Sequence, residues 1–260
     1  MAFPLPMLPT IPQDLRTIEY DPPHLLRHSA DSQGPPFHSS RTALAYEMAF
    51  MKNTLLRGLN SIRARAEGIG GKGDARAGPF AEYVRAFCDV LLADVKGDDE
   101  FFRTPCGGKA KERMGVVLVD ILPGCAPDLS AVVRSVQELK AVVGDADTYD
   151  GKALVAKLAF AGDLYATWER QLKAVDGKRL GDLLSDAEVR EMIDKIVNWF
   201  VAHSDIAYLF PYIFAHHDRA TSEHWPPRAP DSMSLLSGLV AKHPHCWEFA
   251  PFDPMSGKKQ

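Results

Sequence analysis

Four carboxylates lie within seven residues near the end of a predicted helix, at Asp94, Asp98, Asp99 and Glu100. Asp94 and Asp98 are four residues apart, which places both on one face of the helix. A carboxylate cluster in a helical bundle commonly holds a metal cation together with histidine, but no histidine occurs from Ser39 to Ala202. The other chemistry open to such a cluster is acid–base, in which carboxylates share protons with each other or pair with a lysine.

The helix that carries these carboxylates is expected from about Phe80 to Phe102, and a helix of similar length precedes it. Between Thr42 and about Ala66, apolar residues recur close to the helical period, at Leu44, Met48, Met51, Leu55, Leu59 and Ile62. Ser39 or Ser40 is expected to cap the start of this first helix. The glycine-rich run Glu67–Pro79 is expected to form a mobile connection between the two helices.

Further helical stretches follow along the chain. Residues 111–143 are expected to form a helix that Pro123 and Gly124 break or kink, with the helix resuming from residue 128. The stretch 149–175 predicts another helix with a bend at Gly162. The next helix opens at Ser185, where a glutamate three residues later completes a capping box.

The predicted architecture is all-α, a helical bundle in a single domain over residues 39–260. Residues 1–38 are rich in proline and are expected to form an extended arm on the domain. From about residue 207 the chain becomes rich in aromatic, proline and histidine residues, which predicts an irregular but ordered C-terminal extension.

The composition argues against several classes of partner. A net charge of −4 and a pI near 6.1 give no electrostatic case for nucleic acid or an anionic membrane. The sequence has no secretory signal pattern and no run of about 18 apolar residues, so we expect a cytoplasmic protein. Its four cysteines, which we expect to be reduced thiols, have neither CxxC nor zinc spacing: Cys88, Cys106, Cys125 and Cys246. The oligomeric state is left open.

From roughly Thr42 to Gly257, the order of several motifs resembles the fungal hemerythrin-like (HHE cation-binding) proteins. The first helix, YEMAFMKNTLLRGLNSI, is similar to the family's HEMA-x-x-HN-x-x-x-RGLN helix. YDGKALV leads into the helix that carries the last ligands in the family, and LFPYIFAHHD, WPPRAP and HCWEFAPFD are similar to its C-terminal extension. Family members hold two metal ions, typically iron, between four antiparallel helices. The resemblance therefore implies a four-helix up-down hemerythrin-like bundle with an irregular C-terminal extension.

Carried over position by position, the resemblance implies that the metal ligands have been replaced in the first three helices. Lys52 stands at the histidine position of the first helix. Asp94 and Asp98 stand at the histidine-and-glutamate pair of the second helix. The H-x-x-x-H pair of the third helix falls on Leu122 and Ala126.

The last helix of the family also carries a histidine, which falls here on Trp168, with its partner carboxylate near Gln171 or Leu172. A protonated lysine cannot ligate a cation, and two carboxylates alone bind iron or manganese poorly. The resemblance therefore implies a pseudo-hemerythrin with neither metal nor other cofactor, in which the Lys52 ammonium takes the place of the metal's charge.

This reading predicts a mostly apolar central pocket with a few polar groups, a common description of a small-molecule site. Lys52, Asp94 and Asp98 would carry acid–base catalysis on an apolar small molecule, by isomerisation, dehydration or cyclisation, within fungal secondary metabolism. Leu122, Ala126, Trp168 and Gln171 would contact the substrate. The alternatives are a non-catalytic small-molecule binding protein, a residual di-metal oxygen-binding or oxidase protein, and a purely structural lysine–aspartate pair.

The remaining polar clusters are expected to be structural. His216, His217 and Asp218 would suit a ligand or acid–base cluster. The resemblance implies, however, that the His–Asp pair recurs in the family beside the aromatic tail, which favours a structural role. His243 and His245 have no third ligand near them in sequence. Asp99 and Glu100 are expected to be solvated charges at the end of their helix.

Overall fold

A computed structural model describes residues 40–71, 73–105, 117–143, 148–175, 177–219, 225–226 and 232–260. The arm predicted for residues 1–38, the capping residue Ser39 and Cys106 lie outside these ranges. Within them the chain is helical and forms no strand, apart from one isolated antiparallel bridge between Phe252 and Lys259. The predicted all-α class is confirmed.

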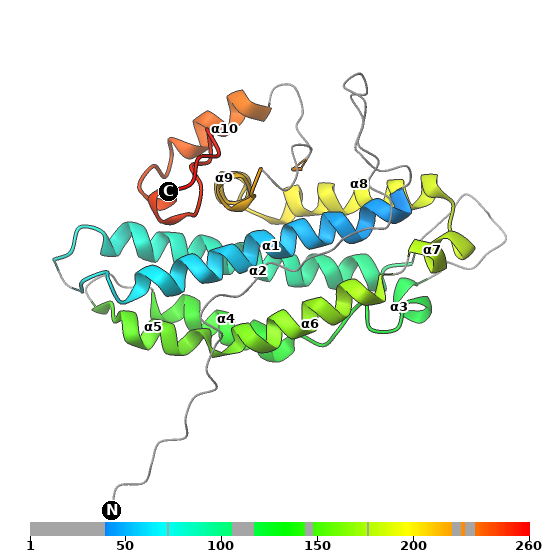
Figure 1. The fold of residues 1–260 in the computed structure, drawn as a ribbon, viewed down its shortest axis with the longest axis horizontal. Coiled ribbons are helices and arrows are strands. Elements are labelled where there is room, and N and C mark those ends of the chain that lie inside the picture. The colour runs from blue at the N-terminus through cyan, green and yellow to red at the C-terminus, as the bar shows by residue number, and fades with distance from the viewer. Residues whose placement is uncertain are drawn as a thin grey trace, which may run out of the picture.

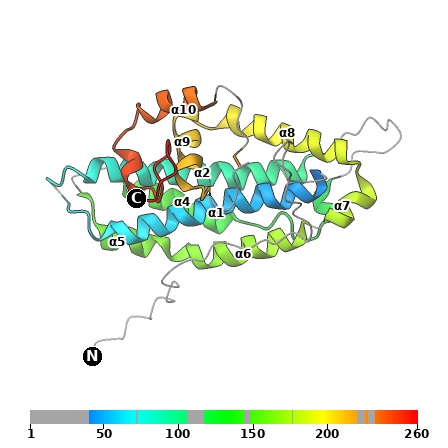
Figure 2. The ribbon, with the colours of Figure 1, turned by 45° about the horizontal axis from the view of Figure 1, so that its top comes forward.

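Two long antiparallel helices, α1 (Ser40–Ala66) and α2 (Ala77–Arg103), run through the middle of the molecule (Figures 1 and 2). Both match the helices expected from the apolar period. Helix α2 begins three residues before the predicted start because Pro79 lies in its first turn, where a missing N–H leaves no helical bond unmade.

The helices α4 (Ser130–Val142), α5 (Gly151–Lys157) and α6 (Ala161–Ala174) lie on one side of this pair. Helix α4 packs on α2, whereas α5 and α6 pack on α1. A 3₁₀ turn, η2 (Leu158–Phe160), separates α5 from α6, close to the predicted bend at Gly162.

The short helix α3 (Leu118–Ile121) precedes α4, and the break expected at Pro123 and Gly124 is complete. Gly124 adopts a φ of +91°, a left-handed conformation that glycine takes without strain. The chain therefore turns fully between α3 and α4, and this turn brings residues 125–129 against α2.

On the opposite side, α8 (Asp186–His203) packs on both α1 and α2. Helix α7 (Gly177–Leu183) lies at the end of the central pair, between α6 and α8, and packs on α1 (Figure 1). Helix α8 begins with the predicted capping box, because the Ser185 side chain accepts from the Glu188 N–H while the Glu188 carboxylate accepts from the Ser185 N–H. Such a cap satisfies two N–H groups that the first turn would leave unpaired.

The C-terminal part is more helical than the predicted irregular extension. Helix α9 (Ile206–His216) contains Pro211 and is capped by Asp205, and it is followed by α10 (Ser232–Val240) and the 3₁₀ turn η3 (Cys246–Phe249). The burial of α9 explains this difference. Helix α9 packs between α10 and the α1–α2 pair, and its apolar contacts offset the one backbone hydrogen bond that Pro211 cannot donate.

Helices α1 and α9 approach closely at Gly58. A Cβ at this position would lie 2.0 Å from the hydroxyl oxygen of Tyr212, whose side chain is fully buried. The absence of a side chain at Gly58 therefore sets how near the C-terminal segment sits to the central pair.

No helix within the described ranges is both long and apolar enough to cross a membrane.

Candidate functional site

Lys52 lies on the buried face of α1, one helical turn before Leu55 and Leu56, and only 1% of its surface is exposed. Its ammonium points to α2, with Nζ 2.6 Å from Oδ2 of Asp98 and 3.3 Å from Oδ2 of Asp94. The two aspartates face the lysine together because they are four residues apart on one helix. The structure thus brings together the three residues that the sequence assigned to catalysis.

Gln171 of α6 completes the polar cluster. Its side-chain Nε2 donates to Oδ2 of Asp98 at 2.9 Å and to the backbone carbonyl of Cys125 at 2.7 Å. Both partners are acceptors, so they fix which end of the amide faces them. The Gln171 Oε1 atom is buried and has no hydrogen-bond partner.

Trp168 lies three residues before Gln171 on α6 and faces the lysine. Its ring centroid is 5.3 Å from Nζ of Lys52, within the range of a cation–π contact. The indole is fully buried, and its Nε1 has no hydrogen-bond partner. The lysine is therefore held by two carboxylates on one helix and an aromatic face on another.

The charges in this cluster follow from its burial. Burial raises the pKa of Asp94 to about 7, against the lowering effect of Lys52, and the neighbouring Asp98 adds to the rise. Burial by itself would lower the pKa of Lys52, but the two carboxylates outweigh it and the lysine pKa is raised. Near neutral pH, Lys52 is therefore a cation, and Asp98 is the closer of its two carboxylate partners.

Asp98 connects the buried cluster to the surface. Its side chain is 15% exposed, compared with 3% for Asp94, and it lines a groove of about 520 Å³ between α2 and α4. We call this the α2–α4 groove. Among the described residues, the hydrogen bonds on the Asp98 carboxylate come from Lys52 and Gln171, and both end on Oδ2.

The groove also places the residues that the sequence assigned to substrate contact. Ala126 and Gln171 line the groove. Leu122 is fully buried and Trp168 contacts Lys52 in the core, so neither of these two residues lines the groove. The predicted site was a central pocket among four helices. The space next to Asp98 is instead a surface groove, because Lys52, Trp168 and Leu122 are packed in the core.

Three residues of the site were not predicted from the sequence. The carbonyl of Cys125 holds Gln171 in place, and a backbone acceptor carries no sequence signal. Val133 and Gln137 of α4 form the far wall of the groove. Their spacing of four residues predicts a shared helix face, but nothing in the sequence shows which helix that face meets.

The donor set does not fit a dinuclear metal centre. The Lys52 ammonium lies between the two carboxylates, where it repels a cation and offers no lone pair. Among the described residues, no group of three or more histidine, cysteine, aspartate or glutamate side chains lies close enough to hold a metal ion. We therefore derive no metal chemistry from this site.

His216 is the most buried of the histidines singled out in the sequence. It stacks between Tyr83 and Tyr212, its Nδ1 bonds the Tyr212 carbonyl at 2.7 Å, and its Nε2 lies 2.6 Å from the Tyr83 hydroxyl. Since a carbonyl can only accept, Nδ1 carries the proton and Nε2 accepts. Burial lowers the His216 pKa to about 3, so this imidazole is neutral and its contacts are those of a packed core residue.

His243 forms a separate polar contact near the N-terminal end of α2. Its Nδ1 lies 2.7 Å from Oε1 of Glu82, and its ring stacks on Tyr208, whose hydroxyl donates to the same oxygen. His245 pairs with Glu248 at the surface. These contacts agree with the packing and surface roles expected for both histidines.

No protein-family model, curated protein or solved structure matched this chain.

Proposed function

We propose that the protein is an enzyme that performs acid–base chemistry on an apolar small molecule bound in the α2–α4 groove, with no cofactor. The observation that carries this proposal is the position of Asp98, which lines the groove and contacts Lys52 at 2.6 Å. An isomerisation, dehydration or cyclisation requires a proton to be moved at the substrate, and Asp98 is the member of the cluster that a substrate can reach.

The other residues have supporting roles in this proposal. Asp98 exchanges a proton with the substrate, and Lys52 and Gln171 hold its carboxyl group in place through their contacts with Oδ2. Asp94 has a pKa of about 7, which suits a group that takes up and returns a proton near neutral pH. Lys52 lies within contact distance of both aspartates and so provides the path between them.

The lining of the groove fits a substrate with an apolar body. Six of its residues present apolar side chains: Leu92, Val95, Ala126, Pro127, Leu129 and Val133. A predominantly apolar surface with a few polar groups at one place is typical of small-molecule sites. The other eight lining residues are polar or charged, namely Lys96, Asp98, Asp99, Arg103, Asp128, Ser130, Gln137 and Gln171. Of these, Arg103 and Asp99 pair with each other.

A direct test is to incubate the purified protein with a panel of apolar ketones and alcohols in D₂O. Mass spectrometry and NMR would follow deuterium exchange at carbon, isomerisation and loss of water. Asp98→Asn should lower any activity by about 10²–10⁴-fold, the usual contribution of one acid–base group. Asp89→Asn is the matched control, since it neutralises an exposed aspartate of α2 that does not line the groove and should leave activity within about twofold. Equal activity in both variants would rule out Asp98 as the catalytic group.

The main alternative is a binding protein that uses the same groove without turnover. A binding protein of this kind would have the same apolar lining, but its Asp98 would contact the ligand without transferring a proton. It predicts that the panel yields ligands, found by a shift in thermal unfolding, none of which exchanges deuterium or changes composition. It further predicts that Asp98→Asn alters affinity alone.

We also propose that the fold is a hemerythrin-like four-helix up-down bundle, formed by α1, α2, α4 and the α5–α6 segment, with α7–α10 added to it. The contacts of α1 with α2, α2 with α4, α4 with α5, and α5 and α6 with α1 support a closed ring of four. The meeting of Lys52, Asp94, Asp98, Trp168 and Gln171 supports it as well, since these positions were aligned with the family's metal ligands. An experimental structure in which α4 or α6 left this ring would refute the proposal.

A further inference from the structure

The α2–α4 groove runs lengthwise between two antiparallel helices. Arg103, at the end of α2, binds the carbonyl of Ala126 just before α4 begins. Lys140, near the end of α4, pairs with Asp89 in the middle of α2. Between these contacts the α2 wall of the groove extends from Leu92 to Arg103, which is about 16 Å at the helical rise per residue. The groove is therefore long enough for an extended molecule.

Asp98 lies near the middle of this wall. It follows Leu92 by six residues and precedes Arg103 by five. Along the axis of α2 these separations are about 9 Å and about 8 Å. The carboxyl group proposed to exchange the proton therefore divides the groove into two parts, which we call the Leu92 half and the Arg103 half.

The Leu92 half has a mainly apolar lining. Leu92 and Val95 of α2 and Val133 of α4 line it, and all three side chains are half-buried. Leu92 and Val95 pack against the hydrophobic core on their inner side. These three side chains therefore form a continuous apolar surface next to Asp98.

Two polar residues also line the Leu92 half, Lys96 of α2 and Gln137 of α4. The Lys96 ammonium lies over the Trp199 ring of α8, 5.8 Å from its centroid, so this charge is held on the other flank of α2. Gln137 is exposed and carries no charge. The walls of the Leu92 half therefore present apolar side chains and a neutral amide to a ligand.

The Arg103 half holds three charged residues. Arg103 pairs with Asp99, and Asp128 accepts from the backbone N–H of Ser130 at the start of α4. The turn at residues 126–129 adds apolar side chains to this half, but the charged groups lie among them. An apolar chain placed here would cover charged groups that water otherwise solvates, which is unfavourable. The apolar part of a ligand is therefore directed to the Leu92 half.

We propose that the substrate of the α2–α4 groove is an elongated molecule whose reacting polar group lies at Asp98 and whose extended apolar tail lies along the Leu92 half. This proposal rests on the acid–base function proposed above and names the class of substrate for it. The tail that fits is about 9 Å long, which is the length of about seven carbons in an extended chain. The groove volume of about 520 Å³ admits a molecule of this size.

The register of the two helices identifies the residue that limits this tail. Lys140 pairs with Asp89, and seven residues from this pair along the antiparallel helices lie Val133 and Lys96. Val133 is therefore beside the part of α2 that is about 3 Å from Asp98 along the helix axis, in the path of the tail. A larger side chain at this position should shorten the space that the tail can use.

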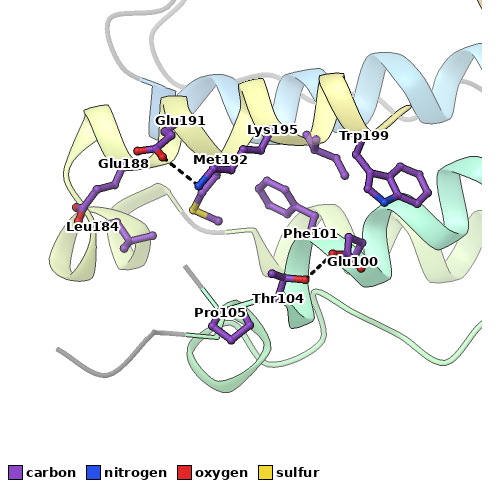
Figure 3. Close-up of a pocket in the computed structure, with 11 residues that line it drawn as sticks. Glu100, Phe101, Thr104, Pro105, Leu184, Glu188, Glu191, Met192, Lys195 and Trp199 are labelled. Atoms are coloured by element: carbon purple, nitrogen blue, oxygen red, sulfur yellow. Dashed lines mark hydrogen bonds and ion pairs between the residues drawn. The ribbon is translucent and has the colours of Figure 1, made fainter. Parts of the chain in front are cut away.

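A smaller hollow on the other flank of α2 is a competing place for an apolar ligand. It lies between the last turn of α2 and α8 and has a volume of about 180 Å³, and we call it the α2–α8 pocket. Phe101 and Met192 extend toward each other across it (Figure 3). Neither residue lines the α2–α4 groove, so Met192→Trp would fill the α2–α8 pocket and leave the groove unchanged.

The experiment titrates the full chain with methyl ketones of increasing length, from 2-pentanone to 2-dodecanone, and measures each Kd by calorimetry. This measurement requires no turnover. Each methylene group that enters the groove should lower the Kd by about two- to fourfold. The gain should end near 2-nonanone, whose tail of seven carbons reaches Leu92.

Variants of Val133 test the position of the tail. Val133→Phe should end the gain about three carbons earlier, and Val133→Leu, a milder change, about one carbon earlier. Both should leave the Kd of 2-pentanone within about twofold, whereas Asp98→Asn should weaken all the ketones by a similar factor, because head and tail contributions at separate places add. Val197→Phe is the matched control, since it makes the same change at a valine of α8 that is 47% exposed, and it should leave the series unchanged.

A Kd that is independent of chain length, or that keeps falling through 2-dodecanone, would overturn the proposal. So would a length limit that Met192→Trp shifts and Val133→Phe does not, because the tail would then lie in the α2–α8 pocket.

Failure of the acid–base function would give a different result. The ketones would then bind with the expected length limit, and none would exchange deuterium in D₂O, so the place of the tail would be supported without the chemistry. If deuterium exchange depends on Asp98 and the affinities show no length limit, the acid–base function stands and the tail proposal is wrong.

Discussion

At the scale of single residues, Lys52 combines full burial with two ionic partners. Replacing it with methionine keeps most of its volume but leaves Asp94 and Asp98 without a cation. Breaking a buried pair in this way costs about 3–5 kcal/mol, so we expect Lys52→Met to lower the free energy of unfolding in urea by about that amount.

Lys195→Met is the control for this change, because it removes an exposed lysine that is also paired with a carboxylate. An exposed pair contributes about 0–1 kcal/mol, and the control should stay within that range. If Lys52→Met is no more destabilising than Lys195→Met, the buried ion pair does not contribute to stability as described.

The raised pKa of Asp94 makes a prediction about pH. Its value of about 7 in the folded protein lies above the ordinary 3.8, so the folded state binds this proton more tightly than the unfolded state does. The stabilising contribution is complete below about pH 4 and is lost as the pH rises through 7. Urea unfolding of the wild type and of Asp94→Asn at several pH values should show a difference that changes over this window. A difference that is constant with pH would contradict the assignment.

At the scale of elements, the contact between α1 and α9 depends on Gly58. Gly58→Ala would bring a methyl group 2.0 Å from the Tyr212 hydroxyl, and overpacking of this kind costs about 1–3 kcal/mol. Tyr212→Phe removes the atom that clashes, so the cost of Gly58→Ala should be smaller in that background. A double-mutant cycle of thermal unfolding measures the coupling directly.

Gly162→Ala is the matched control on α6, because a Cβ there meets nothing within 4 Å. Alanine has the better helix propensity, so this control should gain up to about 1 kcal/mol. Equal effects at Gly58 and Gly162 would show that helix propensity, and not the close approach of α9, governs position 58.

The capping box of α8 gives a second prediction at this scale. Ser185→Ala removes the side chain that accepts from the Glu188 N–H, and such a change costs about 1 kcal/mol. Ser237→Ala, at an exposed serine inside α10, should change stability by less than about 0.5 kcal/mol. Chemical denaturation of both variants separates a cap effect from a general effect of losing a hydroxyl.

At the scale of the whole molecule, the local signals were sufficient for most helices and insufficient for their assembly. The apolar period of α1, the Pro123–Gly124 break and the Ser185–Glu188 cap are properties of short segments, and each is present as predicted. Helix α9 was missed because its formation depends on burial by α10 and the central pair, which offsets Pro211. That contribution comes from residues distant in the sequence.

The candidate site shows the same division. The spacing of Asp94 and Asp98 predicts a shared face, but their convergence on Lys52 and Gln171 depends on how three helices are arranged. The resemblance to the hemerythrin-like proteins, which stays a prediction, implied that these positions would meet, and in the structure Lys52, Asp94, Asp98, Trp168 and Gln171 lie together. The groove beside Asp98 was not predicted, because it is formed where the residue 125–129 turn and α4 meet α2.

The burial of His216 has a consequence for the response of the whole molecule to acid. An imidazole with a pKa of about 3 when folded and 6.5 when unfolded makes the protein less stable as the pH falls below about 6.5. Asp94 has the opposite effect over nearly the same interval. These two contributions therefore oppose each other between about pH 4 and 6.5, while Glu47, whose pKa burial also raises to about 7, adds to the effect of Asp94. Replacing either group alone should expose the slope of the other.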